Sequence, residues 1–370
     1  CHCNNLCIFC SSNANSRNRN NHTSRLVSSR SAVPCSTPTF RHKIETVKYD
    51  VPYGTYDKSR QNELTYDLYL PKANKKTPLV IFAHSGAFFM GDKGANNMVE
   101  LCEDFAKEGY ATATINYHLL TFPQGFLAII EAFDLVQYSK KSIYYALRDV
   151  RAAVRHFKAN SEVYQIDTNN IFLAGYSAGG ILALHTAYTD DREAKDVFSL
   201  PKYETCLDCV GENQQHSSDV RGVISMAGGM FDGTHIEHDD NISACLIHGD
   251  KDGIVPCKTG WPFEKYVTDD INFDVPLFLE ELCMTTTSKG NLEINGLSRK
   301  DCFGLTATFT FASSYLKTIR DKTMPKLQGA ESLAPRFAKK KNHFYQKHIL
   351  AGDPHHLMND ESGAIHTERY

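Results

Sequence analysis

The sequence lacks a long uninterrupted apolar run and carries almost no net charge. Its longest apolar stretches, 78–83 and 126–130, are far shorter than the roughly 20 residues that a membrane-spanning helix needs, so no stable membrane insertion is expected. A formal charge of -3 over 370 residues gives no basis for binding nucleic acid or an anionic membrane surface. With 42% hydrophobic and 22% charged residues, the composition is that of a globular protein with a substantial core.

Acidic residues are missing from positions 1–44, where Ser, Asn and Arg are plentiful. Such a segment buries too little apolar surface to offset the entropy of ordering its backbone. We therefore expect residues 1–42 to be disordered or leader-like and residues 43–370 to form one folded domain. The Arg-rich composition also fits a transit peptide, whereas the continuous apolar stretch of a signal peptide is missing.

Cysteine, by contrast, is abundant. Twelve cysteines are many for a cytosolic protein of this length and indicate an oxidising compartment. The chain is accordingly expected to be secreted or extracellular, with a cytoplasmic or organellar location as the alternative. Cys206 and Cys209 form either a local disulfide or an incidental loop feature, because a redox role requires a thioredoxin-like context that the sequence lacks.

Two clusters contain residue types that bind metals. Four cysteines within residues 1–10 have a spacing that would suit a metal ion, but no histidine pair follows them. The stretch 235–240 holds two histidines and two aspartates, and it is predicted to be a solvated loop. No metal site is therefore predicted.

Apolar periodicity predicts an α/β fold with a mostly parallel central sheet and helices on both faces. Residues 44–49 and 64–70 alternate in polarity as antiparallel strands do, whereas 79–83 is apolar on both faces like a buried parallel strand. Strands and helices then alternate, which implies right-handed crossovers. Further strands are predicted at 111–117, 171–174, 220–226, 244–248 and 344–350, and helices at 96–108, 142–159 and 178–189. Residues from about 261 to 326 break this rhythm and are predicted to be an insertion.

The strongest local signal is Gly-Tyr-Ser-Ala-Gly-Gly at 175–180, between a buried strand and an apolar helix. In a nucleophile elbow a serine occupies a strained turn, and glycines two positions before and after it let the strand and the helix approach closely. Ser177 is therefore the candidate nucleophile. The amide of Ala178, at the helix N-terminus, would face a developing negative charge. The alternative is an ordinary glycine-rich turn.

A second signal, His-Ser-Gly-Ala-Phe-Phe-Met-Gly at 84–91, follows the first buried strand. It resembles the His-Gly-Gly oxyanion motif of carboxylesterases and lipases in the α/β-hydrolase superfamily, with Ser85 where the family usually has glycine. The resemblance implies the α/β-hydrolase fold and an oxyanion hole formed by the amides of Gly86, Ala87 and Ala178. His84 would be a structural residue of this loop.

In that family the acid and the base follow the nucleophile in chain order. Residues 248–256 resemble its pattern of histidine, glycine, two residues, aspartate and then valine-proline, which assigns the acid to Asp252 and leaves Asp250 as a loop or capping carboxylate. The run Gly-Asp-Pro-His-His at 352–356 resembles the family's ending. It assigns the base to His355, with His356 as the alternative.

The resemblance covers about residue 44 to the C-terminus apart from the insertion, so residues 43–370 would be a catalytic domain. It implies a serine carboxylic ester hydrolase that forms an acyl-enzyme on Ser177, acts on a small-molecule ester and needs no metal or organic cofactor. The alternatives are a serine peptidase or amidase of the prolyl-oligopeptidase type and a non-catalytic hydrolase-fold binding protein. No nucleic-acid partner is expected, and no oligomeric state is predicted.

Overall fold

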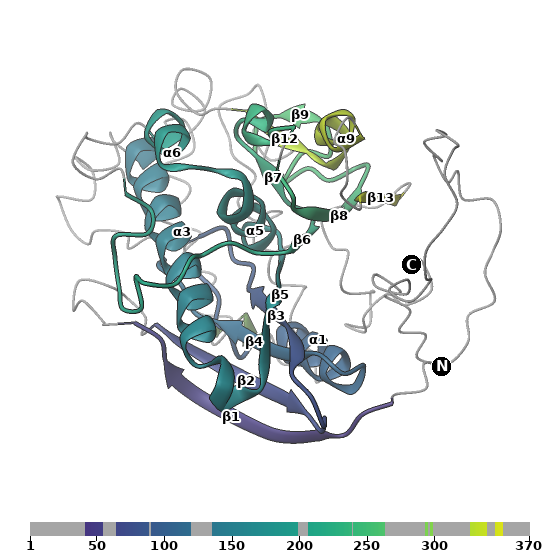
Figure 1. Cartoon of the computed structure of the whole chain (residues 1–370). Helices are drawn as coiled ribbons and strands as arrows, with labels where there is room; N and C mark the ends of the chain where they lie inside the picture. The colour runs from purple at the N-terminus through teal and green to yellow at the C-terminus, as the bar shows by residue number, and fades with distance from the viewer. Residues whose placement is uncertain are drawn as a thin grey trace, which may run out of the picture.

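The centre of the molecule is a mixed sheet of eight strands in the order β1-β2-β4-β3-β5-β6-β8-β13 (Figure 1). The computed structural model describes residues 41–54, 64–88, 90–119, 135–198, 206–238, 240–262, 293–294, 297–298, 326–338 and 345–350. Within these ranges the predicted α/β fold, a mostly parallel central sheet with helices on both faces, is confirmed. Nearly all of the leader-like segment, most of the insertion, and the candidate bases His355 and His356 lie outside the described residues.

The antiparallel part of the sheet lies at its N-terminal edge. Strand β1, Ile44–Pro52, pairs with β2, Thr65–Pro71, and β2 pairs with β4, Ala111–Ile115, both in antiparallel register. β1 is mostly exposed, as an edge strand is, whereas β2 is buried at every position except Leu70. The two N-terminal strands predicted from alternating polarity are therefore both present.

The rest of the sheet is parallel. Beside β4 lie β3 (Thr77–Ala83), β5 (Ile166–Tyr176), β6 (Gly222–Met226), β8 (Ser243–Gly249) and β13 (Tyr345–Leu350). Parallel strands bring their carboxyl ends to one edge, where ligands bind in open α/β sheets. At that edge Ala83 pairs with Gly175, and Tyr176 pairs with Met226.

Helices cover both faces of the sheet (Figure 1). They are α1 (Asn96–Lys107), α3 (Leu135–Ala159), α4 (Ser161–Tyr164), α5 (Ala178–Tyr188), α6 (Asp191–Phe198) and α9 (Ala330–Ala338), with a 3₁₀ turn η3 (Gly233–His235). Val80 and Phe82 of β3 pack with α1, whereas Leu79 and Ile81 point to the opposite core, which α3, α5 and α9 share. Alternate side chains of one strand thus enter two separate cores.

Differences from the prediction include those at β5, α3 and α6. β5 begins at Ile166, where it pairs with Thr77, rather than at the predicted residue 171. Residues 167–170 are polar but continue the strand. α3 begins seven residues before its predicted start, at Leu135 rather than 142. α6 was not predicted, since its only buried residues, Ala194 and Phe198, are too few to give an apolar stripe.

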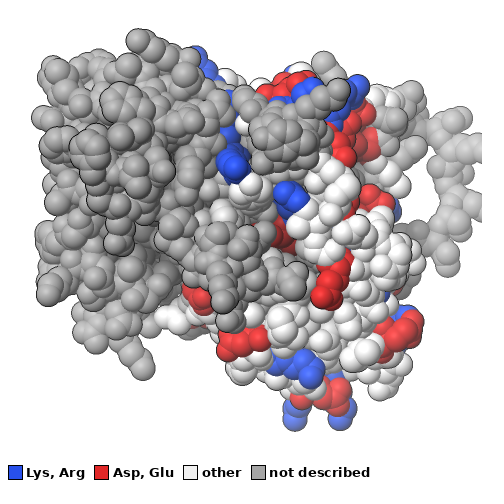
Figure 2. Space-filling view, turned by 90° about the vertical axis from the view of Figure 1, so that its left-hand side faces the viewer, with Lys and Arg blue, Asp and Glu red and all other residues white. Residues whose placement is uncertain are grey.

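Charged side chains are spread over the described surface. On the face shown in Figure 2, Lys and Arg are interspersed with Asp and Glu rather than gathered by sign. Among the described helices, none combines the length and the apolar character that crossing a membrane requires.

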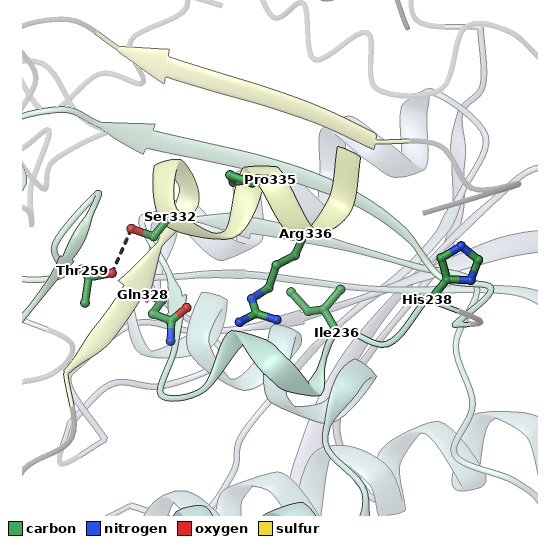
Figure 3. A pocket seen from close by; sticks show the side chains of 7 residues that line it. All are labelled: Ile236, His238, Thr259, Gln328, Ser332, Pro335 and Arg336. Carbon is green, nitrogen blue, oxygen red and sulfur yellow. Dashed lines mark hydrogen bonds between the residues drawn. The ribbon is translucent and has the colours of Figure 1, made fainter. Parts of the chain in front are cut away.

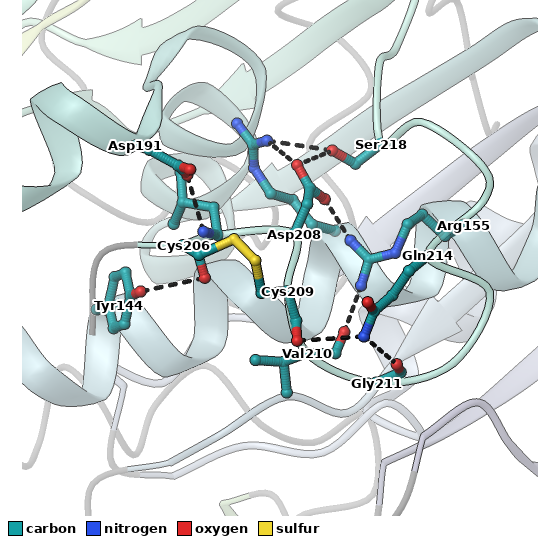
Figure 4. The surroundings of a disulfide bond; sticks show 12 residues. Tyr144, Arg155, Asp191, Cys206, Asp208, Cys209, Val210, Gly211, Gln214 and Ser218 are labelled. Carbon is teal, nitrogen blue, oxygen red and sulfur yellow. Dashed lines mark hydrogen bonds and ion pairs between the residues drawn. A yellow bond between two sulfur atoms is a disulfide. The ribbon is translucent and has the colours of Figure 1, made fainter. Parts of the chain in front are cut away.

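An arginine pair fastens the loop that follows α6 to helix α3, and a disulfide closes a short turn within that loop (Figure 4). Cys206 and Cys209 are bonded, which decides between the two readings of this pair. The short loop between them presents Asp208 to α3, where Arg151 Nη1 donates to Asp208 Oδ2 over 2.7 Å and Arg155 donates to Asp208 Oδ1. Arg155 is fully buried and also donates to the carbonyl of Val210, so its charge is satisfied within the protein.

Asp208→Asn is expected to lower the free energy of unfolding by about 2 kcal/mol, because it leaves the buried Arg155 without its carboxylate. The loss is limited since 42% of the Asp208 side chain is exposed. Urea denaturation measures it, with Glu162→Gln as the matched control because that residue forms an exposed pair with Lys76. The control should change stability by less than about 0.5 kcal/mol, and equal losses in the two variants would contradict this account.

Candidate active site

Ser177 occupies a strained turn between the end of β5 and the start of α5. Its backbone angles are φ 55° and ψ -116°, in a region that residues with a side chain rarely adopt. The turn is held by the Ser177 amide, which donates to the carbonyl of Met226 over 2.8 Å, and by the Ser177 carbonyl, which accepts from the amide of Ile181. Neighbouring strands and the first turn of α5 thus impose this conformation on the serine.

The two glycines that flank Ser177 are required by close backbone contacts. A Cβ atom on Gly175 would lie 2.2 Å from the carbonyl carbon of Gly179. A Cβ atom on Gly179 would lie 2.0 Å from the carbonyl oxygen of Ala83, at the end of β3. The elbow therefore packs directly against the end of β3, and the spacing of glycines in the sequence has the physical cause that the motif predicts.

Gly179→Ala is expected to destabilise the fold by about 3 kcal/mol or more, because the added methyl group would collide with the backbone of Ala83 and His84, which cannot give way as a flexible side chain can. Thermal and urea unfolding measure the loss. The matched control is Gly94→Ala, whose Cβ would meet only the side-chain oxygen of Asp92, and it should shift stability by under about 1 kcal/mol. A Gly179→Ala protein as stable as this control would show that the elbow is not packed as described.

The loop after β3 has an unusual backbone. Gly86, Ala87 and Phe88 have consecutive positive φ angles of 123°, 51° and 68°. A side chain on Gly86 would collide with the carbonyl of Met90, whose amide donates back to the Gly86 carbonyl over 3.1 Å. Ser85, where the family usually has glycine, is not among the residues with positive φ, so a side chain is tolerated there without strain.

His84 supports this loop from inside the protein. Its Nδ1 lies 2.6 Å from the carbonyl oxygen of Ser85, so Nδ1 carries the proton and donates. The ring stacks on Tyr117 at 4.2 Å, and the hydroxyl of Tyr117 donates to the His84 carbonyl over 2.7 Å. Burial lowers the pKa of His84 to about 4, so the imidazole is neutral at pH 7. This environment agrees with the structural role expected for His84.

The three predicted oxyanion donors belong to two segments that contact each other. Ala178 is the first residue of α5, and an amide at this position has no acceptor within its own helix. In the described part of the chain, the amides of Gly86 and Ala87 form no backbone hydrogen bond. Gly179 packs against the carbonyls of Ala83 and His84. The segment that carries the Ala178 amide therefore contacts the segment that carries the amides of Gly86 and Ala87.

Asp252 and Asp250 occupy very different surroundings after β8. The Asp252 side chain is fully buried, and its Oδ1 accepts from the amides of Ile254 and Val255, both at 2.9 Å. Asp250 is exposed. A buried carboxylate fixed by backbone donors is the arrangement expected of an orienting acid, whereas Asp250 has the exposure of a loop carboxylate.

His248 is a neighbour of Asp252 that the sequence did not single out. It is fully buried in β8, and its Nε2 lies 3.1 Å from Asp252 Oδ2 and 2.9 Å from the carbonyl oxygen of Val255. Because a carbonyl can only accept, Nε2 carries the proton and donates. The sequence did contain a signal for this contact, because His248 and Asp252 are four residues apart where a strand meets a turn. In the sequence analysis His248 was used only to find the motif that contains Asp252.

The proposed base lies beyond the described residues, although the strand that leads to it is visible. β13 runs parallel to β8 and ends at Leu350, which pairs with Gly249. The chain therefore leaves the sheet at the same edge as Asp252, five residues before His355. Neither His355 nor His356 can be compared with Ser177 from the described part of the chain.

The stretch 235–240 is not simply a solvated loop, contrary to the prediction. His235 is only 5% exposed, and its Nδ1 lies 3.2 Å from the hydroxyl of Thr189. The same hydroxyl lies 3.0 Å from Nδ1 of His185. These hydrogen bonds join η3 to the end of α5. Among the described residues, no group of three His, Cys, Asp or Glu side chains could hold a metal ion.

Stability should fall in mild acid, because two buried histidines must stay neutral in the folded state. Burial lowers the pKa of His84 to about 4 and that of His185 to about 3, from 6.5 in the unfolded chain. The unfolded state therefore binds more protons below pH 6.5, and stability is lost as the pH falls from there toward pH 4. Urea unfolding should show a loss of roughly 4 kcal/mol between pH 7 and pH 4.5. An unchanged free energy of unfolding over this range would refute the neutral assignment.

Comparison with known proteins points to esterases and lipases. Residues 66–238 match the BD-FAE family model. Gut esterase 1 of Caenorhabditis elegans is 28% identical over 143 residues, which cover 38% of this chain and 24% of that protein. Bile salt-activated lipase of Homo sapiens is 33% identical over 144 residues, which cover 36% of this chain and 17% of the lipase. The matched part thus spans less than a quarter of either relative.

Two esterases are among the solved structures that resemble this chain. The truncated form of a carbohydrate esterase from gut microbiota is 16% identical, with coverage of 85% of this chain and 90% of the other and a TM-score of 0.47. Thermogutta terrifontis esterase 2 phosphorylated by paraoxon is 14% identical, with 92% coverage of both chains and a TM-score of 0.49.

Proposed function

We propose that this chain, whose residues 66–238 match the BD-FAE family model, hydrolyses carboxylic esters through an acyl-enzyme on Ser177. The observation that carries the proposal is the strained Ser177 turn, with φ 55° and glycines that cannot be replaced on either side. A fold tolerates such strain where the position of one side chain matters, as it does for a nucleophile.

The proposed reaction has two steps that share one base. Ser177 Oγ attacks the ester carbonyl carbon while its proton passes to His355, and the C–O bond to the alcohol then breaks as the alcohol takes that proton. Water, deprotonated by His355, attacks the acyl-enzyme in the second step, which releases the carboxylic acid and returns the proton to Ser177. These steps use only side chains, backbone amides and water, so no metal or organic cofactor is proposed.

Asp252 is the proposed partner of His355, and its surroundings support this role. Two backbone amides donate to Oδ1 of the carboxylate, and His248 Nε2 lies 3.1 Å from Oδ2. We infer that His248 helps to position Asp252, because its Nε2 donates to the carbonyl of Val255 in the same loop. The carboxylate would hold the tautomer of His355 and stabilise the imidazolium that forms during attack.

The negative charge on the ester oxygen requires donors that are already in place. The amides of Ala178 and of Gly86 or Ala87 are proposed to supply them, each contributing about 3 kcal/mol of transition-state stabilisation. Support comes from the backbone contact between the elbow and the end of β3, which holds the two donor segments together. The helix N-terminus at Ala178 adds a favourable dipole.

A series of p-nitrophenyl esters from acetate to palmitate tests the proposal, because it covers the short acyl and longer lipid esters that the names of the relatives suggest. Methyl ferulate and an acetylated sugar extend it to other ester classes. We expect turnover of at least one ester. A peptide p-nitroanilide in parallel tests the peptidase alternative, and preference for the anilide over every ester would favour it. No turnover of any substrate by folded protein would favour the non-catalytic alternative.

We further propose that the protein works in an oxidising compartment, outside the cytosol. The Cys206–Cys209 disulfide supports this, because such bonds persist mainly where thiols are oxidised. Mass spectrometry of protein alkylated before reduction should find these two cysteines unlabelled.

A further inference from the structure

A polar cavity lies beside the small sheet that joins three distant parts of the chain (Figure 3). This sheet has the order β7-β12-β9, in which β12, Leu327–Gly329, pairs with β7, Gly229–Met230, on one side and with β9, Thr259–Gly260, on the other. With helix α9 it borders an open hollow of about 620 Å³. That volume is in the range of small-molecule sites.

The cavity lies across β12 from the loop that carries Asp252. Successive side chains of a strand point to opposite faces. A Cβ on Gly329 would collide with the carbonyl oxygen of Pro256, so this face of β12 packs on the loop that follows Asp252. Gln328 points the other way and lines the cavity. None of the residues that line this cavity therefore has a role in the proposed catalytic reaction.

Arg336 gives the cavity a positive charge. Its guanidinium extends from α9 into the hollow, between Gln328 and Ile236 (Figure 3). Within the described part of the chain, no carboxylate lies within 4 Å of it to form an ion pair. Asp232, whose Oδ1 accepts from the amide of Thr234 over 2.8 Å, interacts with Arg336 electrostatically at longer range.

The other polar residues of the lining are Thr259, Ser332, Gln328 and His238. Thr259 Oγ1 donates to Ser332 Oγ over 3.0 Å, which leaves the Ser332 hydroxyl proton to donate toward a ligand. The amide of Gln328 adds both a donor and an acceptor. Ile236 and Pro335 supply apolar surface at the same hollow. One cation, two hydroxyls, an amide and an imidazole thus line a site with a small apolar wall.

We propose that this cavity binds a small hydroxycarboxylate, such as a sugar acid. A guanidinium fork matches a carboxylate with two parallel, charge-assisted hydrogen bonds, which are stronger than those that it donates to the hydroxyl oxygens of a neutral sugar. The hydroxyls of Thr259 and Ser332 and the amide of Gln328 pair with ligand hydroxyls, while Ile236 and Pro335 pack on its C–H face. The inference rests on the lining of the cavity and is independent of the proposed role of Ser177.

Binding of glucuronate and of glucose to the full chain tests the proposal, by ligand-observed NMR and calorimetry. We expect glucuronate to bind at least tenfold more tightly than glucose, and Arg336→Gln to weaken glucuronate at least tenfold. Lys258→Gln is the matched control, because Lys258 lies next to Thr259 but pairs with Glu331, outside the lining; it should change affinity less than twofold.

Several results would overturn the proposal. Equal affinity for glucose and glucuronate would exclude recognition of the carboxylate, and this comparison needs only the unaltered protein. Inorganic phosphate binding as tightly as glucuronate would show a general anion site without recognition of hydroxyls. If Arg336→Gln fails to fold, Ser332→Ala replaces it, and glucuronate affinity unchanged in that variant would exclude the proposed contact.

Discussion

Ser177→Ala is expected to lower kcat for the best p-nitrophenyl ester by at least about 10⁴-fold, because removal of a serine nucleophile eliminates the acyl-enzyme and leaves only the oxyanion donors and binding. Stability should change little. Alanine has the same Cβ as serine, so it meets the same strain at φ 55°, and the hydrogen bonds that hold the turn come from the backbone.

Ser161→Ala provides a matched control. Ser161 is 8% exposed against 6% for Ser177, but it lies at the opposite edge of the sheet, before the amino end of β5. This variant should retain kcat within about twofold. If Ser177→Ala kept more than about a tenth of the wild-type kcat, Ser177 would not be the nucleophile.

Asp252→Asn is expected to lower kcat by about 10³- to 10⁴-fold, the loss that follows when an orienting carboxylate becomes an amide. An amide has one acceptor oxygen where the carboxylate has two. In this site Oδ1 accepts from Ile254 and Val255, and Oδ2 faces His248 Nε2. The asparagine NH₂ would therefore face His248 Nε2, which is itself a donor. The substitution thus removes the negative charge and also weakens the hydrogen bonding of this loop.

Asp250→Asn separates the role of Asp252 from a general effect of charge in this loop. The two aspartates are two positions apart, but Asp250 is exposed. We expect Asp250→Asn to change kcat by less than about threefold. The reverse ranking of the two variants, measured with the same ester and at the same pH, would assign the acid to Asp250.

The elbow could be predicted because its determinants are local. A buried strand, a serine between paired glycines and an apolar helix follow one another within residues 171–189, and each leaves its own signature. The structure adds the reason for the second glycine, whose neighbour is Ala83, more than ninety residues away in sequence. The choice of Asp252 over Asp250 came from resemblance and agrees with their burial.

Features that depend on distant pairing could not be predicted. β12 joins residues near 229 and 259 to residues near 328, and strands of two or three residues are too short to show any period. The burial of His235 depends on Thr189 and His185, which belong to another element. Likewise the contact between His248 and Asp252 arises because the chain turns back after β8. The pattern of apolar residues along the sequence does not predict such a turn.

Labelling with a fluorophosphonate tests the central claim most directly, because the probe reacts with an activated serine and mass spectrometry locates the adduct. The account predicts one modified peptide, with the adduct on Ser177, and loss of labelling in Ser177→Ala. It also predicts labelling slowed by at least about a hundredfold in Asp252→Asn, since activation of the serine depends on its base. An adduct on another serine, or no adduct on folded protein, would contradict it.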